Sequence, residues 1–230
     1  MSKTQFAQAR EAVRQHLEEN GIPDHMHYGP VSDRYWGEPC KLVAINMEPY
    51  GYQGCGWVDV GRDVLFGWIY DEGGTGTRTA RYTFALLSVA LAHLSGDEEP
   101  TREGFRSAYG SSEGIEDALE RTVYYNIRPD SNDNKAQDFR RIAETGDAGL
   151  GCLVWDEIRA LEADALLVGG RAGLAAVNRL TGMDTWIPFR GSGISPEGFL
   201  VQSIPHPSRA NYAVWEEVVR ALGRQCAGEA

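Results

Sequence analysis

Apolar residues recur along the chain in two kinds of pattern. A helical period, in which apolar residues return every three or four positions, predicts helices at residues 4–19, 79–94, 135–145, 152–162, 172–180 and 212–222. A further short helix is expected to begin at Thr101, because threonine often caps helix N-termini. Four short apolar runs predict buried strands at residues 42–46, 123–127, 165–168 and 199–204.

The order of these elements predicts the fold class. Strands that alternate with helices indicate right-handed βαβ crossovers, so we expect an α/β fold: a three-layer αβα sandwich with a central, mainly parallel four-stranded sheet. The chain of 230 residues, 42% of them apolar, can bury one core and contains no linker-like stretch, which predicts a single domain over residues 1–230. Residues 52–76 are rich in glycine and aromatics, and the apolar piece 64–70 either pairs as a hairpin or covers the site.

Composition limits the location and the partners. No apolar run approaches the roughly 20 residues of a membrane span, and the N-terminal segment has no apolar signal core, so we expect a cytoplasmic protein with no membrane partner. The four cysteines include no Cys-x-x-Cys pair, which favours reduced thiols. The net charge of -11 argues against non-specific binding of nucleic acid. A nucleic-acid partner would need a local basic face, for which the candidates are Arg78, Arg81, Arg102, Arg106, Arg140 and Arg141.

Two polar segments follow predicted strands. The first is Asn46-Met47-Glu48-Pro49-Tyr50-Gly51, and the second is Pro205-His206-Pro207-Ser208-Arg209-Ala210-Asn211. Loops at the carboxyl ends of parallel strands form the ligand crevice of an open α/β sheet. We therefore expect the carboxylate of Glu48 and the imidazole of His206 to face one another across one site.

The motifs, taken in order, resemble a known family. Asn46-Met47-Glu48-Pro49, Tyr125-Asn126, the stretch from Glu157-Ile158 to Gly169, and His206-Pro207-Ser208 occur in the order and spacing of the uracil-DNA glycosylase superfamily. The chain looks closest to the single-strand-selective monofunctional branch, because Met47-x-Pro49-x-Gly51 and a tail running from His206 to Trp215 are similar to the two signatures of that branch. The resemblance spans about residues 42–215 and implies a uracil-DNA glycosylase-like domain that cleaves an N-glycosidic bond.

The resemblance also implies roles for three residues. Glu48 would position water or stabilise positive charge on the sugar, although the family has Asp or Asn there. His206 would donate a hydrogen bond to the departing base, and Asn126 would read the edge of that base. Each residue also has an ordinary structural interpretation: Glu48 as a loop cap or ion-pair partner, His206 as a turn residue and Asn126 as the start of a turn.

Further positions are expected to hold the base and the DNA. Trp57 is the candidate for stacking on the flipped base, with Tyr50 as its competitor, and Met47 and Gly51 complete the base-binding set. Tyr50 stands where one branch keeps a Tyr that excludes a 5-methyl group, but Gly51 replaces the His of that branch, so the width of the pocket stays open. Ser208, Arg209 and Asn211 lie where the family inserts a wedge into the duplex. A charged Arg209 is unlike an apolar wedge and is suited to hold a phosphate instead.

The sequence predicts no metal and no cofactor. His25 and His27 have no third ligand near them and are interpreted as a surface loop. The iron–sulfur branches of the superfamily require a cysteine set that the chain lacks. The glycines at 73–76 are not followed by Gly-Lys-Ser/Thr, so a flexible lid is expected there rather than a phosphate loop.

The favoured hypothesis is a monomeric, monofunctional DNA glycosylase that flips a damaged or modified pyrimidine out of DNA and leaves an abasic site. No lysine lies in the motifs, so a Schiff-base lyase step is not expected. One alternative is an anti-phage defence enzyme that excises bulky modified cytosines from foreign DNA. The others are a non-catalytic nucleic-acid binding protein and a hydrolase of free nucleosides.

Overall fold

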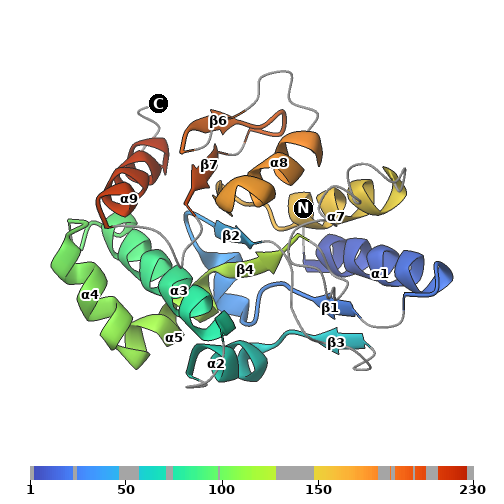
Figure 1. Ribbon diagram of the computed structural model, residues 1–230, viewed down its shortest axis with the longest axis horizontal. Coiled ribbons are helices and arrows are strands. Elements are labelled where there is room, and N and C mark those ends of the chain that lie inside the picture. The colour runs from blue at the N-terminus through green and yellow to red at the C-terminus, as the bar shows by residue number, and fades with distance from the viewer. Residues whose placement is uncertain are drawn as a thin grey trace.

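A five-stranded sheet lies between two layers of helices in the computed structural model (Figure 1). The structure describes residues 3–22, 25–46, 57–70, 75–97, 99–127, 148–180, 187, 190–198, 200–205 and 212–226. The strand order is β4-β2-β5-β7-β6, where β2 is Leu42–Asn46, β4 is Val123–Asn126, β5 is Ala165–Gly169, β6 is Ser192–Ile194 and β7 is Leu200–Ile204. The first four strands in this order are parallel, and β6 pairs antiparallel with β7.

Helices cover both faces of this sheet. One layer contains α1 (Lys3–Glu19), α7 (Ala148–Ala160) and α8 (Gly170–Leu180) (Figure 1). The other contains α2 (Arg62–Tyr70), α3 (Thr75–Leu94), α4 (Arg102–Gly110), α5 (Ser112–Arg121) and α9 (Tyr212–Cys226). A 3₁₀ turn, η1 (Asp33–Gly37), contacts α5. The predicted α/β class with a three-layer arrangement and a mainly parallel sheet is confirmed.

The four predicted strands are β2, β4, β5 and β7, and β6 adds a fifth that the four-stranded prediction lacked. Helices were also predicted at the positions of α1, α3, α7, α8 and α9, whereas the one predicted at 135–145 lies outside the described residues. Thr101 caps α4 as expected, because its hydroxyl accepts a hydrogen bond from the Gly104 N–H at 3.0 Å. The adjoining α5 was not predicted. Its cap is Ser111, whose hydroxyl accepts from the Gly114 N–H at 3.2 Å.

Two local predictions are wrong, and one of the two alternatives for residues 64–70 is excluded. Residues 64–70 belong to α2, which excludes the hairpin alternative, and the buried Leu65 and Ile69 lie one helical turn apart. His25 and His27 are in a strand, β1 (His25–His27), which pairs in parallel with β3 (Trp57–Asp59), and the His27 side chain is buried rather than on a surface loop. A strand of three residues is too short to show a period in the sequence.

The second wrong prediction concerns the cysteines. Cys40 is disulfide-bonded, against the expectation of reduced thiols, while Cys152 on α7 is an exposed free thiol.

Among the described helices, none is long and apolar enough to cross a membrane.

The core lies on both faces of the central strands. All five residues of β2, β5 and β7 and all four of β4 are buried, which explains why these strands are mostly apolar in the sequence rather than alternating. The polar exceptions are Gln202 and Ser203 in β7 and the asparagines that end β2 and β4. On the α3 side the ring of Tyr124 stacks on Phe84 with 5.8 Å between ring centroids. Because side chains alternate along a strand, Tyr125 points to the opposite face, toward α1 and α7.

The buried side chains of β2 should contribute more to the free energy of unfolding than the exposed side chains of β6. Ile45 is fully buried, whereas Ile194 on β6 is 51% exposed. We expect Ile45→Ala to lower the free energy of unfolding by about 2–5 kcal/mol, and the matched Ile194→Ala to change it by less than about 0.5 kcal/mol. Urea denaturation of the two variants measures the difference, and equal losses would contradict this placement of the core.

Candidate functional site

The carboxyl ends of β2 and β5 form the topological switch point of the sheet. The chain leaves β2 for β4 through α2 to α5 on one face, and it leaves β5 for β7 through α8 on the other (Figure 1). In open α/β sheets the ligand crevice lies where neighbouring strands send their connections to opposite faces. The candidate site is therefore the edge at which β2, β4 and β5 end.

Two buried asparagines end neighbouring strands at this edge. Asn46 of β2 is directly in register with Asn126 of β4, and their exposed fractions are 6% and 5%. The Ile127 N–H donates to the Asn46 carbonyl at 3.1 Å, which ties the two strand ends together. Residues paired in parallel strands point to the same face, so both amides lie on the face that carries Tyr124 and α3. Within the described part of the chain, the side-chain nitrogen Nδ2 of Asn46 has no hydrogen-bond partner.

The end of β5 contributes backbone rather than side chains to this sheet edge. β5 ends at Gly169, and Gly170 starts α8 with a φ of 77°, a conformation that favours glycine. A Cβ at Gly173 would lie 3.4 Å from Val168 Cγ1, so α8 packs closely on the strand that precedes it. The N-terminus of α8 consequently lies at the same sheet edge as Asn46 and Asn126.

A buried acid lies beneath the same edge on the opposite face. The Tyr125 hydroxyl donates to Glu157 Oε2 at 2.8 Å, and both side chains are buried between β4 and α7. Burial raises the pKa of the Glu157 carboxyl from 4.5 to about 7, although the hydrogen bond from Tyr125 and the positive charge of Arg10 act in the opposite direction. Burial and the adjacent Glu157 charge also raise the pKa of the Tyr125 hydroxyl well above its usual range.

Of the predicted site residues, Asn126 is fully described, and it occupies the carboxyl end of β4. The backbone of Trp57 begins β3 and pairs with His25. The remaining candidates lie outside the described residues: Met47, Glu48, Tyr50, Gly51, His206, Ser208, Arg209 and Asn211. The strands that precede them, β2 and β7, are parallel and flank β5.

Of the six arginines predicted to form a basic face, three have side chains that the structure describes. Arg81 on α3 donates from Nε to the Tyr109 carbonyl at 3.0 Å, and its guanidinium lies over the rings of Tyr70 and Tyr109. Arg102 and Arg106 are exposed four residues apart on α4. Of the other three candidates, the side chain of Arg78 and the whole of Arg140 and Arg141 lie outside the described residues.

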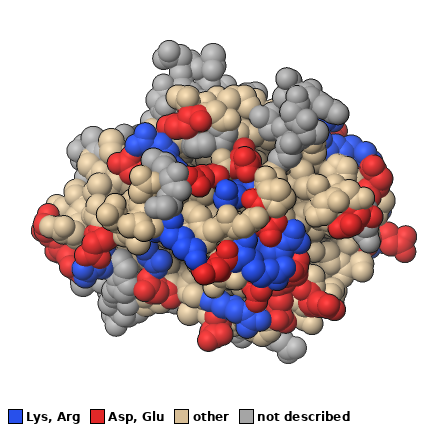
Figure 2. All heavy atoms as spheres, turned by 180° about the vertical axis from the view of Figure 1, so that it is seen from behind, with Lys and Arg blue, Asp and Glu red and all other residues tan. Residues whose placement is uncertain are grey.

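Other arginines are held in ion pairs. Arg34 pairs with Asp117 at 2.7 Å, Arg62 with Glu116 at 2.9 Å and Arg121 with Glu38 at 2.8 Å. Figure 2 shows basic and acidic side chains side by side across one face of the molecule. Such paired charges do not form the continuous basic surface that non-specific nucleic-acid binding requires.

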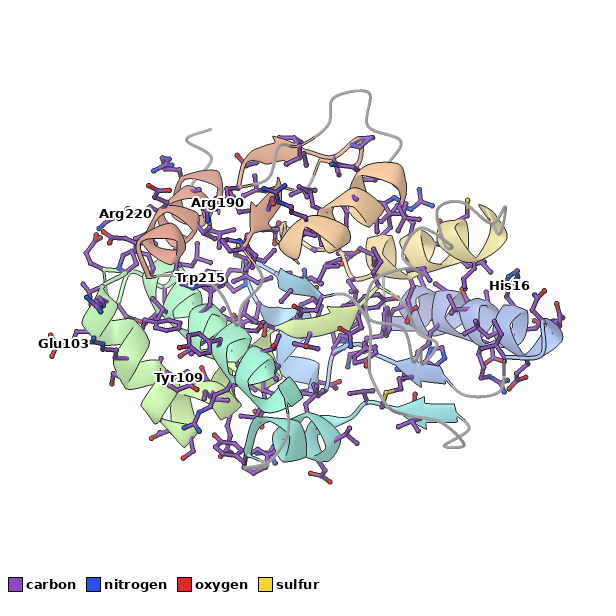
Figure 3. All side chains as sticks on the ribbon, in the orientation of Figure 1. His16, Glu103, Tyr109, Arg190, Trp215 and Arg220 are labelled. Carbon is purple, nitrogen blue, oxygen red and sulfur yellow. The ribbon has the colours of Figure 1, made fainter. Side chains whose placement is uncertain are left out.

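Trp215, the last residue of the resemblance, is a core residue. It lies where α9 packs on α3 (Figure 3) and borders the same small apolar gap as Leu86 and Phe105. Among the described residues, no group of three or more His, Cys, Asp or Glu side chains could hold a metal ion.

Two features of the site were missed from the sequence. The sequence predicts no role for Asn46 beyond its place in a motif, although a polar residue at the end of an apolar strand is an available signal. It likewise predicts no role for Glu157 beyond its place in a motif. Its partner, Tyr125, lies 32 positions away, so no local spacing could reveal the pair.

Neither a scan against protein-family models nor a search of curated proteins finds a match to this chain. The fold and the sheet edge define the class: an α/β protein in which two buried amides and a helix N-terminus lie at the switch point of the sheet.

The Glu157 carboxyl should make stability depend on pH. Between pH 4.5 and about 7 the folded state keeps a proton that the unfolded state has lost, so stability falls as pH rises through this window. Integrated over the window, the loss is on the order of 3 kcal/mol. Glu157→Gln removes the titration and should be more stable than the wild type at pH 8, with a much smaller advantage at pH 4.5.

Chemical denaturation of wild type and variant at both pH values checks this expectation. Glu217→Gln, an exposed acid on α9, is the matched control and should keep the wild-type pH dependence. A difference between Glu157→Gln and wild type that is the same at both pH values would show that Glu157 has an unshifted pKa.

Proposed function

We propose that the protein is a monofunctional DNA glycosylase that flips a damaged or modified pyrimidine out of DNA and hydrolyses its N-glycosidic bond. The observation that carries the proposal is the position of Asn126. This amide is buried at the carboxyl end of β4, beside the strand end from which the Glu48 segment continues. A buried amide at a sheet edge offers one donor and one acceptor to a base, while the flanking strands exclude water.

The proposed reaction uses three side chains. Water attacks C1′ of the deoxyribose, the C1′–N bond breaks, and its electron pair goes to the base. Glu48 is assigned to the water and to the positive charge that develops on the sugar, and His206 donates to the base oxygen that becomes negative. Asn126 holds the base edge. The products are the free base and an abasic site, and no covalent intermediate with the protein forms.

The charge distribution favours contact with few DNA phosphates rather than with many. The net charge is -11, and among the described residues Arg34, Arg62 and Arg121 are engaged in ion pairs rather than available to phosphates. Arg102, Arg106 and Arg209 are the proposed exceptions. This favours a partner that exposes its base easily, such as single-stranded DNA or a duplex with a weakened pair, because extrusion then costs less binding energy.

The activity is tested by incubating the protein with oligonucleotides that contain uracil, an oxidised pyrimidine, hydroxymethylcytosine or glucosylated cytosine. Alkali then breaks the strand wherever a base has been lost. Cleavage confined to the cytosine derivatives would favour the defence role, and release of bases from free nucleosides alone would favour a nucleoside hydrolase. If the protein binds DNA tightly but forms no abasic site on any of these substrates, the proposal that it is an enzyme is refuted.

The assignment of the site is tested on whichever substrate is cleaved. Glu48→Gln, His206→Ala and Asn126→Ala should each lower kcat/KM by a factor on the order of a hundred or more, because each removes a group that acts on the reacting base or sugar. His16→Ala on α1 and Glu217→Gln on α9 are the controls and should keep the wild-type rate. Wild-type rates in the first three variants would refute the assignment.

A further inference from the structure

Asn46 is the polar exception in an otherwise apolar strand. Its side chain is 6% exposed, and within the described part of the chain its Nδ2 donor has no hydrogen-bond partner. Nearly all buried polar groups in native proteins have a partner, because an unmade buried hydrogen bond costs folding free energy. An apolar residue at this position would avoid that cost, so the fold itself does not call for an asparagine.

The neighbours of Asn46 direct its amide to the crevice. On one side it is in register with Asn126, and on the other side Ile45 pairs with Val168, which places the next position beside Gly169. Gly169 has no side chain that could shield or bond the amide. The Asn46 carbonyl accepts from the Ile127 N–H at 3.1 Å, which fixes the backbone from which the side chain extends.

We infer that Asn46 is a second base-reading residue, whose Nδ2 donates a hydrogen bond to a carbonyl oxygen of the flipped pyrimidine beside Asn126. This inference rests on the proposed glycosylase function. Adjacent parallel strands lie about 4.8 Å apart, so one heterocyclic base spans both amides. With Nδ2 directed at the oxygen on C4, the site discriminates against cytosine, because the C4 amino group of cytosine would face a second donor and Nδ2 would stay unpaired. The favoured substrates are pyrimidines with an oxygen there, such as uracil and its oxidised or 5-substituted relatives.

In the free protein the unpaired Nδ2 of Asn46 costs folding free energy. The effect of a substitution on stability therefore distinguishes a binding role for Asn46 from a structural role. Asn46→Ala removes an unpaired donor and should leave the thermal midpoint of the free protein unchanged or raise it. Asn178 of α8 is the matched control, a buried amide that donates to the Ile187 carbonyl at 3.3 Å and accepts from the Ile187 N–H at 3.4 Å. Asn178→Ala should lower the midpoint by several degrees.

Binding is measured by titration calorimetry with free uracil, 5-hydroxymethyluracil and cytosine as probes. Asn46→Ala should weaken the binding of the two uracil-type bases at least tenfold. Asn46→Asp keeps the size of the side chain but offers an acceptor, and it should lower the ratio of uracil to cytosine affinity by tenfold or more. A purely structural Asn46 would not change this ratio.

The outcomes separate this inference from the proposed function. DNA cleavage that Asn46→Ala leaves at the wild-type rate and specificity would overturn the inference alone. Base binding that depends on Asn46, in a protein that cleaves no DNA, would support the inference and refute the glycosylase. A wild-type protein that binds none of the bases and cleaves no DNA would overturn both.

Discussion

The candidate site depends on the pairing of β2 with a parallel strand on each side. Ile45 is fully buried and lies opposite both Tyr125 and Val168, so the position of β2 is fixed by the core rather than by its loops. A shift of one residue would exchange the two faces of the strand and move the Asn46 amide into the place of Ile45. The cost of burying that amide in the apolar core excludes such a shift. Core packing therefore sets the positions of Asn46 and Asn126 at the crevice.

The same constraint explains how much of the fold could be predicted from the sequence. β2, β4, β5 and β7 are buried on both faces and are mostly apolar, and the helices between them have one apolar face, so the sequence predicted both kinds of element. The strands β1, β3 and β6 have three residues each and show no period. In α2 nearly every residue from Val64 to Tyr70 is apolar, so helix and strand could not be distinguished until Leu65 and Ile69 were seen on one buried face.

The site was predictable to a smaller extent than the fold. A polar residue directly after an apolar run indicated Asn126, because that pattern depends on neighbours in the sequence. Whether a polar group has a partner depends on neighbours in space, which is why Asn46 and the Tyr125–Glu157 pair were missed. The same limit applies to Arg81, whose engagement with Tyr109 depends on how α4 packs on α3.

The two ends of the sheet differ in how they treat polar groups. At the amino end the Lys41 N–H donates to Asp164 Oδ2 at 2.6 Å, and Arg121 and Glu38 form a close ion pair, so these polar groups stabilise the fold. At the carboxyl end the Asn46 Nδ2 and Glu157 Oε1 atoms are buried without partners among the described residues. Selection for stability alone would replace such groups with apolar side chains, because unpaired buried polar atoms oppose folding. Among the described residues the buried Trp215 Nε1 also lacks a partner, in the core between α3 and α9, so an unpaired atom alone does not mark a site. At Asn46 the unpaired atom coincides with the switch point of the sheet, which argues that binding, rather than folding, determines this residue.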